Sequence, residues 1–216
     1  MTRLVSLTVG GDANSWQAIG LDSSRSSLVL ADVELRVVAA PAGLVSWTIA
    51  VEPSFTGPRG DVAIDGIPTI VVDDPGHHRH VESLIRDQRV VTLDHVVVST
   101  DDPDRTCAAI ESAIGAEVRR VRRLDNGVEQ RFHKLDNTII EVVSGPNLES
   151  DGARLWGMVV SVDDLFALAD SLGNDVMSPP KRATQPGRFI STVRGSAGVG
   201  VPFAMMTPHV PGLPTH

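Results

Sequence analysis

An approximate internal repeat is the feature of this sequence that most limits its possible folds. The stretch "HVVVSTDDPDRTCAAIESAIG", residues 95–115, aligns with "GMVVSVDDLFALADSLG", residues 157–173. The two share "VVS", a "DD" pair and a terminal glycine. A repeat of about 55 to 60 residues indicates that one supersecondary unit is used twice.

The first copy of the repeat predicts the order strand, helix and three strands. The valines of 90–100 indicate a strand, on which alternation puts His95, Val97 and Ser99 on one face. A helix is predicted over 101–115. Asp102 suits its N-cap, Pro103 its first turn and Gly115 its end. The remaining strands of this copy, separated by the turn signals "DNG" and "DN", are expected at 116–124, 128–135 and 137–145.

The second copy predicts the same order with a Pro-rich connection after its helix. Its strands and helix are expected at 154–162, 163–173, 187–195 and 199–207. Upstream of both copies, β-branched runs predict a strand-rich region with one short helix. Its elements are expected at 4–9, 12–20, 26–40 and 44–52. Residues 53–88 hold many turn formers around "IPTIVV" and are expected to form a long, partly ordered connection.

These patterns predict an α+β protein. An N-terminal strand-rich, degenerate βαβββ-like module is assigned to 1–75 and a connection to 76–91. A domain of two βαβββ modules is assigned to 92–216, with its modules at 92–147 and 153–208. Three strand-rich units leave one unit with an unmatched edge, which proteins rarely leave bare. The first unit then packs against its own neighbours or pairs with a second chain, and we expect a homodimer.

Charge and composition exclude several classes of protein. The formal net charge is −8, whereas nonspecific nucleic-acid binding needs clustered Lys and Arg. The one basic run, "RRVRR" at 119–123, is typical of the solvated face of a strand. The lone Cys107 excludes an internal disulfide and is expected to be a buried structural thiol. No run is long and apolar enough for a membrane span, and we expect a cytoplasmic protein.

The tandem βαβββ pattern, with "LDHVVV" opening one unit and "IIEVV" closing its last strand, resembles the vicinal oxygen chelate superfamily. That superfamily includes glyoxalase I, extradiol dioxygenases and bleomycin- or fosfomycin-resistance proteins. The resemblance covers about 90–208 well and 3–52 loosely. It implies a half-open, U-shaped mixed sheet around a small-molecule cavity. It also implies metal ligands on the first and last strands of each unit.

The superfamily's ligand positions are only partly kept. His95 falls on the first-strand position and Glu141 on the last-strand position of one unit, and alternation lets both face one cavity. In the other unit Gly157 and Ala204, or a methionine beside it, stand at these positions. Imidazole with carboxylate suits Fe, Mn, Zn or Ni, but a divalent ion needs about three protein ligands to be held firmly.

A third ligand has two possible sources, His133 and the loop cluster His77, His78 and His80. His133 is expected to be a half-exposed strand residue, and the loop histidines a solvated cluster. Two interpretations of His95 and Glu141 stay open. They form a hydrogen-bonded pair without a tightly bound metal, which is favoured, or they hold a divalent ion. As a metal-free pair, Glu141 acts as a general base and His95 orients it.

Further residues are expected around the cavity. Gln130 and Phe132 alternate together, and Gln185 and Arg188 come from "QPGR". Arg188 suits the carboxylate of a ligand, although a surface arginine beside a turn is equally consistent. The tryptophans are expected to pack in the core; they are Trp16, Trp47 and Trp156.

Two functions follow from the resemblance and these residues. The first is a glyoxalase-like enzyme, a lyase, isomerase or dioxygenase, that binds a small oxygenated molecule with an incomplete metal site. The second is a metal-free protein of the bleomycin-resistance type that binds or sequesters a small molecule. Loss of metal ligands is no handicap for this second function.

Overall fold

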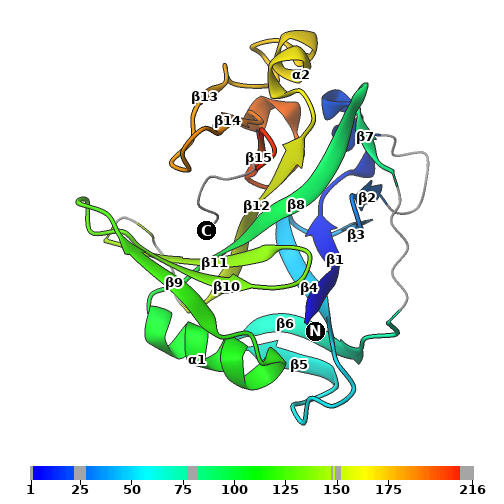
Figure 1. Cartoon of the computed structure of the whole chain (residues 1–216). Helices are drawn as coiled ribbons and strands as arrows, with labels where there is room; N and C mark the ends of the chain where they lie inside the picture. The colour runs from blue at the N-terminus through cyan, green and yellow to red at the C-terminus, as the bar shows by residue number, and fades with distance from the viewer. Residues whose placement is uncertain (1, 22–27, 77–81, 147, 149–151, 210–216) are drawn as a thin grey trace.

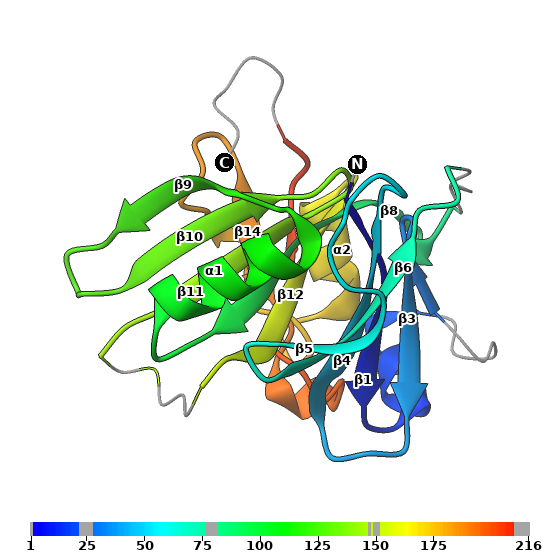
Figure 2. The same ribbon diagram turned by 90° about the horizontal axis from the view of Figure 1, so that it is seen from below.

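The fold is built from two β-sheets with few helices. The computed structural model describes residues 2–21, 28–76, 82–146, 148 and 152–209. Figure 1 shows the N-terminal sheet, in blue and cyan, on one side of the long strands β8 and β12. In the view of Figure 2, α1 lies along one face of the strands β9, β10 and β11. Among the helices of the described part, none is long and apolar enough to cross a membrane.

The larger sheet contains both copies of the repeat, each in the order βαβββ. The first copy comprises β8 Gln88–Ser99, α1 Pro103–Ile114, β9 Val118–Arg123, β10 Glu129–Lys134 and β11 Ile139–Ser144. The second comprises β12 Arg154–Val162, α2 Leu165–Leu172, β13 Lys181–Arg182, β14 Phe189–Thr192 and β15 Phe203–Met206, with a short 3-10 helix, η2 Gly195–Ala197, before its last strand. In both copies the first strand pairs in parallel with the last. The predicted α+β fold with tandem βαβββ modules is confirmed.

The two copies join where β8 and β12 pair antiparallel. The order across this sheet is β13-β14-β15-β12-β8-β11-β10-β9, and β7 Leu84–Ile85 pairs with β8 at one side. The sheet therefore has β9 at one edge and β13 at the other. The helix limits follow the sequence signals, because the Asp102 side chain accepts from the backbone N–H of Arg105 and Gly115 has a positive φ of 68°.

The N-terminal region forms a separate sheet of six strands. Its elements are β1 Arg3–Gly10, the 3-10 helix η1 Ala13–Ile19, β2 Leu28–Leu30, β3 Val33–Val38, β4 Gly43–Val51, β5 Gly60–Ile64 and β6 Ile67–Asp73. The order is β2-β3-β1-β4-β6-β5. β1 pairs in parallel with β3 and antiparallel with β4, and β4 pairs in parallel with β6. This is the pairing pattern of the larger sheet with one outer strand fewer on each side.

The expected long connection over 53–88 is wrong for residues 60–73. Residues 60–73 form the β5–β6 hairpin, and "IPTIVV" is β6 in the N-terminal sheet. The hairpin turns at Asp65 and Gly66, whose φ values of 49° and 87° suit the Asp-Gly turn that matches the twist of paired strands. The loop histidines His77, His78 and His80 lie outside the described residues.

The N-terminal sheet packs against its own chain. One contiguous apolar core takes in residues of both sheets, from Leu4 and Trp47 to Val160 and Met205. The side chain of Asn137, in the β10–β11 turn, bonds both backbone groups of Leu4 on β1, at 3.0 Å to its N and 2.8 Å to its O. The first of the two expected arrangements is therefore present within one chain. The homodimer stays a prediction.

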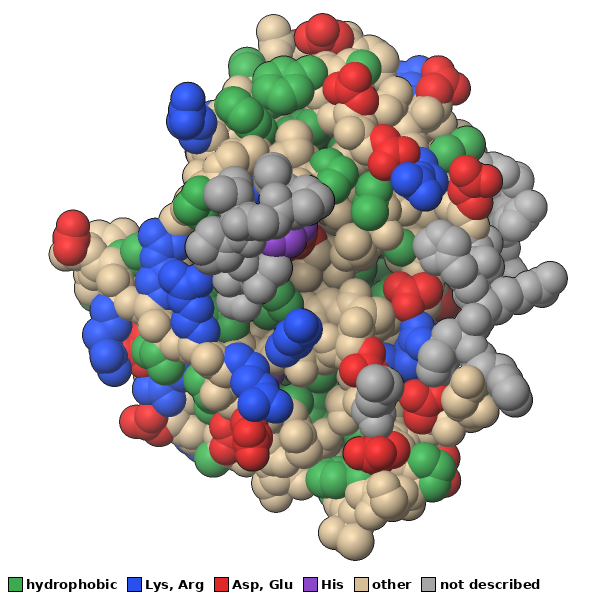
Figure 3. Space-filling view, viewed as in Figure 1, with side chains coloured by type: hydrophobic (Ala, Val, Ile, Leu, Met, Phe, Trp, Pro, Cys, Tyr) green, Lys and Arg blue, Asp and Glu red, His purple; other side chains and the backbone are tan. Residues whose placement is uncertain are grey.

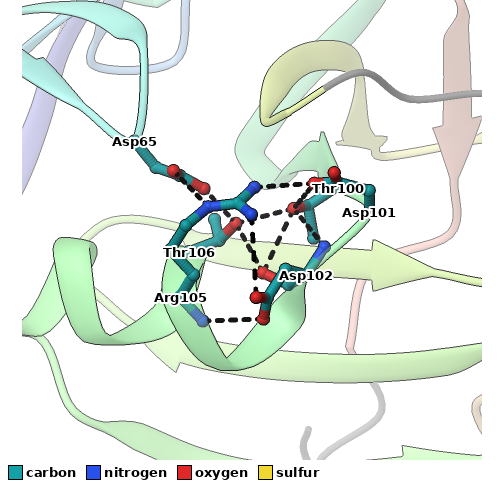
Figure 4. Close-up of polar contacts among 6 residues, drawn as sticks. All are labelled: Asp65, Thr100, Asp101, Asp102, Arg105 and Thr106. Atoms are coloured by element: carbon teal, nitrogen blue, oxygen red, sulfur yellow. Dashed lines mark hydrogen bonds and ion pairs between the residues drawn. The ribbon is translucent and has the colours of Figure 1, made fainter.

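A polar cluster joins the β5–β6 turn to the start of α1 (Figure 4). The Asp65 carboxylate accepts from Nε of Arg105 at 2.7 Å and from the hydroxyl of Thr106 at 2.5 Å. Thr106 is fully buried and its hydroxyl lies 2.7 Å from that of Thr100. The Asp65 side chain is 11% exposed. A little-exposed carboxylate thus links the two parts of the chain.

We predict that Asp65→Asn destabilises the protein. Asn keeps the positive-φ turn but removes the charge that Arg105 neutralises and to which Thr106 donates, which costs about 1 to 2 kcal/mol of unfolding free energy. Urea denaturation measures the change. Asp61→Asn is the matched control because Asp61 is an exposed residue of β5, the strand that leads into the turn. An equal effect of the two substitutions contradicts this role of Asp65.

Candidate functional site

The concave face of the larger sheet carries the polar residues that the sequence singled out. Strand register places Glu141 beside Val97 on one side and beside Phe132 on the other. On β8, Val96 and Val98 are fully buried in the core. Val97 and Ser99 line a cavity together with His95. The predicted alternation along β8 is therefore confirmed from His95 onward.

His95 and Glu141 lie side by side in this cavity. Nε2 of His95 is 3.3 Å from Oε2 of Glu141, and each side chain is 12% exposed. The other carboxylate oxygen, Oε1, accepts from Nε2 of Gln130 at 2.6 Å. The carboxylate thus has one neutral donor and one titratable partner, and both hold it at the end of the cavity.

Asp94 is the member of this group that alternation did not predict. It lies at a β-bulge, because His95 pairs with Val159 while Leu93 pairs with Val160, which leaves Asp94 as the extra residue. The bulge lets Leu93 reach the core and places Oδ1 of Asp94 3.0 Å from Nδ1 of His95. The adjacent "DH" in "LDHVVV" is the only local signal for this contact.

Arg188, a residue of the second module, binds the Asp94 side chain. Its Nη2 donates to Oδ2 of Asp94, its Nε donates to the backbone oxygen of Thr207 at 2.9 Å, and its Nη1 donates to Oε1 of Gln185 at 2.9 Å. Arg188 is only 4% exposed. The guanidinium expected to bind a ligand is engaged by three acceptors of the protein. Substrate binding by Gln185 or Arg188 stays a prediction.

Electrostatics fix the charge state of Asp94. Burial alone would raise the pKa of this carboxyl, but hydrogen bonds from His95 and Arg188, with their positive charge, outweigh burial and lower the pKa to about 2. Asp94 is therefore ionised, and Nδ1 of His95 donates to it. The opposite ring nitrogen, Nε2, faces the Glu141 carboxylate.

Three cavities meet at this group. The first, about 340 Å³, holds His95, Gln130 and Glu141 at one end. Its other lining residues are mainly apolar: Val97, Ser99, Val143, Leu148, Trp156, Met158, Val159, Ile190, Thr192, Pro202, Phe203 and Ala204. A second, about 450 Å³, also contains His95, Gln130 and Glu141 and adds Phe132. A third, polar and about 470 Å³, lies at Asp94 and Arg188. The volumes suit small molecules.

Gln130 has a side-chain hydrogen-bond acceptor, Oε1, that lacks a partner among the described residues. Its Nε2 donates to Glu141, whereas its Oε1 is buried without a hydrogen-bond partner in the described part of the chain. Buried polar atoms are normally paired, and an exception needs an explanation. A ligand hydroxyl or N–H, or a water molecule, would satisfy this oxygen beside the Glu141 carboxylate.

The second module has no room for a histidine at Gly157. A Cβ there would lie 2.7 Å from the backbone oxygen of Pro202, the residue just before β15. Ala204 faces the same cavity with a methyl group. Within the described ranges, no group of three or more His, Cys, Asp and Glu residues could hold a metal ion. These residues do not fit a firmly held divalent ion.

The expectation for His133 is wrong. It is fully buried, and its Nδ1 lies 2.7 Å from the backbone oxygen of Ala116. Burial lowers its pKa, which keeps the ring neutral. Side chains alternate along β10. Gln130 and Phe132 face the cavities, so His133, the next residue along the strand, lies on the opposite face. It therefore cannot join His95 and Glu141 on the concave face.

Two other expectations concern single residues. Cys107 is buried on α1, and burial raises the pKa of its thiol to about 11, which confirms the structural thiol. Trp16 and Trp47 are buried as expected. Trp156 is 44% exposed and lines the apolar cavity, so the core position expected for it is wrong. A bulge in β12 at Trp156 turns it out of the core.

Three comparisons with known proteins were made, with family models, curated proteins and solved structures. No protein-family model and no curated protein matches the chain. Solved structures that are similar include methylmalonyl-CoA epimerase from Mycobacterium tuberculosis, at 18% identity and a TM-score of 0.48, covering 56% of this chain and 90% of that one. The Streptomyces coelicolor epimerase in complex with 2-nitronate-propionyl-CoA has 17% identity and a TM-score of 0.47, with coverage of 56% and 99%.

Likenesses at these identities and TM-scores assign no superfamily to this chain. The assignment of the fold itself rests on the order and register of the strands. The ligand named for the S. coelicolor structure is 2-nitronate-propionyl-CoA.

We predict that stability depends on the Asp94 charge at acid pH. Because the pKa of Asp94 is lowered in the folded state, ionisation of this carboxyl stabilises the folded state relative to the unfolded chain. This contribution, about 2 kcal/mol, is present above pH 4 or so and is lost as pH falls towards about 2. Urea denaturation of the wild type and Asp94→Asn across this range measures it. A difference between them that is the same at low and neutral pH contradicts this assignment.

Proposed function

We propose that this chain binds a small oxygenated molecule in the apolar cavity and transfers a proton to or from it, with Glu141 as the general base. The observation that carries the proposal is the Glu141 carboxylate at the polar end of an otherwise apolar cavity. Gln130 holds one of its oxygens and His95 faces the other. A carboxylate with little access to water is suited to this role.

The proton step needs no group outside the chain. A C–H bond next to a ligand carbonyl breaks, and its proton passes to an oxygen of Glu141. The electron pair moves onto the carbonyl oxygen as an enolate. His95 then shares the proton through Nε2, 3.3 Å away, while ionised Asp94 stabilises a positive charge on its ring. Return of a proton to carbon completes an isomerase-type reaction.

Three residues position the Glu141 carboxylate and the His95 ring beside it. Gln130 fixes the carboxylate by a 2.6 Å hydrogen bond. Asp94 fixes the ring of His95, and Arg188 fixes Asp94 from the second module. Such a chain holds the base within the narrow range of geometry that proton transfer needs. The spare Oε1 of Gln130 provides an acceptor for a ligand hydroxyl in the same place.

Metal-dependent versions of the function have less support from these residues. A dioxygenase needs a redox metal with about three protein ligands. His95 and Glu141 supply two, and they already contact each other. A third ligand would have to come from outside the described residues, for which His77, His78 and His80 are the sequence candidates.

A second candidate function is metal-free binding or sequestering of a small molecule. The apolar lining of the cavity favours it, because Val97, Val143, Met158 and Phe203 offer burial to a ligand without any chemistry. In this case the pair of His95 and Glu141 only hydrogen-bonds the ligand. The two functions differ in whether Glu141 is needed for a change in the ligand.

We predict that Glu141→Gln removes proton transfer but not folding. The probes are three carbonyl compounds, each with a C–H on a methyl-substituted carbon next to the carbonyl: 2-methylcyclohexanone, 2-phenylpropanal and ethyl 2-methylacetoacetate. In D₂O, the wild-type protein is expected to speed hydrogen–deuterium exchange of at least one of them, measured by proton NMR. Glu141→Gln is expected to slow that exchange by about a hundredfold or more, because the amide cannot accept the proton.

Glu129→Gln is the matched control for this experiment. Glu129 precedes Gln130 on β10, so its side chain lies on the face away from the cavities. It pairs there with Arg131 and Arg123. Its substitution is expected to leave exchange unchanged. If no compound exchanges in a Glu141-dependent way, proton transfer is contradicted and the sequestering function is favoured.

A further inference from the structure

The second cavity has a basic wall that the proton-transfer site does not use. We define this basic wall as Arg122, Lys181 and Arg182, which line the cavity of about 450 Å³. Arg122 comes from β9 and the other two from β13, the strands at the two opposite edges of the sheet. Curvature of the sheet thus brings cations from both modules to one cavity. Figure 3 shows Lys and Arg side chains gathered over the β9 side of this face.

Arg122 belongs to "RRVRR", the run expected to be the solvated face of a strand. It pairs with Gln130 in the β9–β10 register and is half-buried. Its neighbour Arg123 pairs with Glu129, whose side chain also binds Arg131, and Arg131 reaches Asp104 on α1. Arg123 therefore lies on the helix side of the sheet and Arg122 on the cavity side. Only part of the basic run is a solvated face.

Among the described residues, those of the basic wall do not pair closely with an acid, although Glu141 lines the same cavity. Within the described part of the chain, no hydrogen bond or ion pair joins Arg122, Lys181 or Arg182 to a carboxylate. Arg105 and Arg131, by contrast, each bind two acids closely. This is notable in a chain with 27 acidic and 19 basic residues. Like charges around one cavity repel each other, and an anion would relieve that repulsion.

The basic cavity and the apolar cavity adjoin at the catalytic group. They share four lining residues, namely His95, Gln130, Glu141 and Ile190. A molecule that occupies both therefore has its middle atoms beside the Glu141 carboxylate. Its apolar end lies among Val97, Val143 and Phe203, and its other end lies at the basic wall.

We infer that the ligand of this site is an amphipathic anion. It has a small apolar group for the first cavity, an anionic carboxylate or phosphate group for the basic wall, and its reactive carbonyl between them. This inference rests on the proposed function and deepens it, because it names the class of molecule that the site selects. The basic wall selects the charge, and the apolar cavity selects the size of the other end.

Two fluorescent probes with one skeleton test the inference. The anionic probe is 1-anilinonaphthalene-8-sulfonate and the neutral probe is N-phenyl-1-naphthylamine. Fluorescence titration is expected to show tighter binding of the anionic probe. Arg122→Gln is expected to weaken the anionic probe about fivefold and leave the neutral one unchanged. Added NaCl is expected to weaken only the anionic probe. Octanoate and octyl phosphate, as competitors, distinguish a carboxylate from a phosphate.

Matched variants separate the possible outcomes. Arg123→Gln removes the same charge on the helix side of the sheet. It is expected to leave the binding of both probes unchanged. Val143→Phe fills the apolar cavity and is expected to weaken the binding of both probes. Thermal melting checks that this variant folds. Trp156→Ala changes the lining of the same cavity and is used as a second variant. Equal binding of both probes with no effect of Arg122→Gln overturns the anionic ligand, while cavity binding and Glu141-dependent exchange stand. If Val143→Phe changes neither probe, a ligand spanning both cavities is overturned.

Discussion

The bulge at Asp94 in β8 is the constraint on which the site depends. Without an extra residue at this point, the period of two would place Leu93 on the same face as His95. The bulge lets Leu93, Val96 and Val98 all enter the core while His95 faces the cavity. It also sets Asp94 against Nδ1 of His95, so one backbone irregularity satisfies the core and orients the histidine.

The asymmetry of the two modules has a steric origin at position 157. Pro202, just before β15, accepts from the backbone N–H of Met158 at 3.1 Å, and its oxygen leaves no space for a Cβ at Gly157. The second module instead contributes Arg188, which contacts Asp94 beside His95. The first module thus carries the residues proposed for proton transfer, and the second carries Arg188 and most of the apolar lining.

The sequence predicts the regular parts of this structure well, because they follow local rules. β12 begins and ends where the apolar run does, and α1 has the expected capping residues. His95 and Glu141 meet as alternation predicts. The β5–β6 hairpin was missed although its Asp65-Gly66 turn is a local signal. Asp94 and Trp156 could not be placed, because a bulge breaks the period of two and depends on the partner strand. The burial of His133 depends on the packing of α1 against the sheet.

The contact between Arg188 and Asp94 crosses from one module to the other, so the position of His95 depends on how the modules meet. If the segment around Arg188 separates from β8, Asp94 loses its cation while the strands of the first module stay paired. Partial opening of the C-terminal strands would then disturb the proposed site while most of the core remains folded.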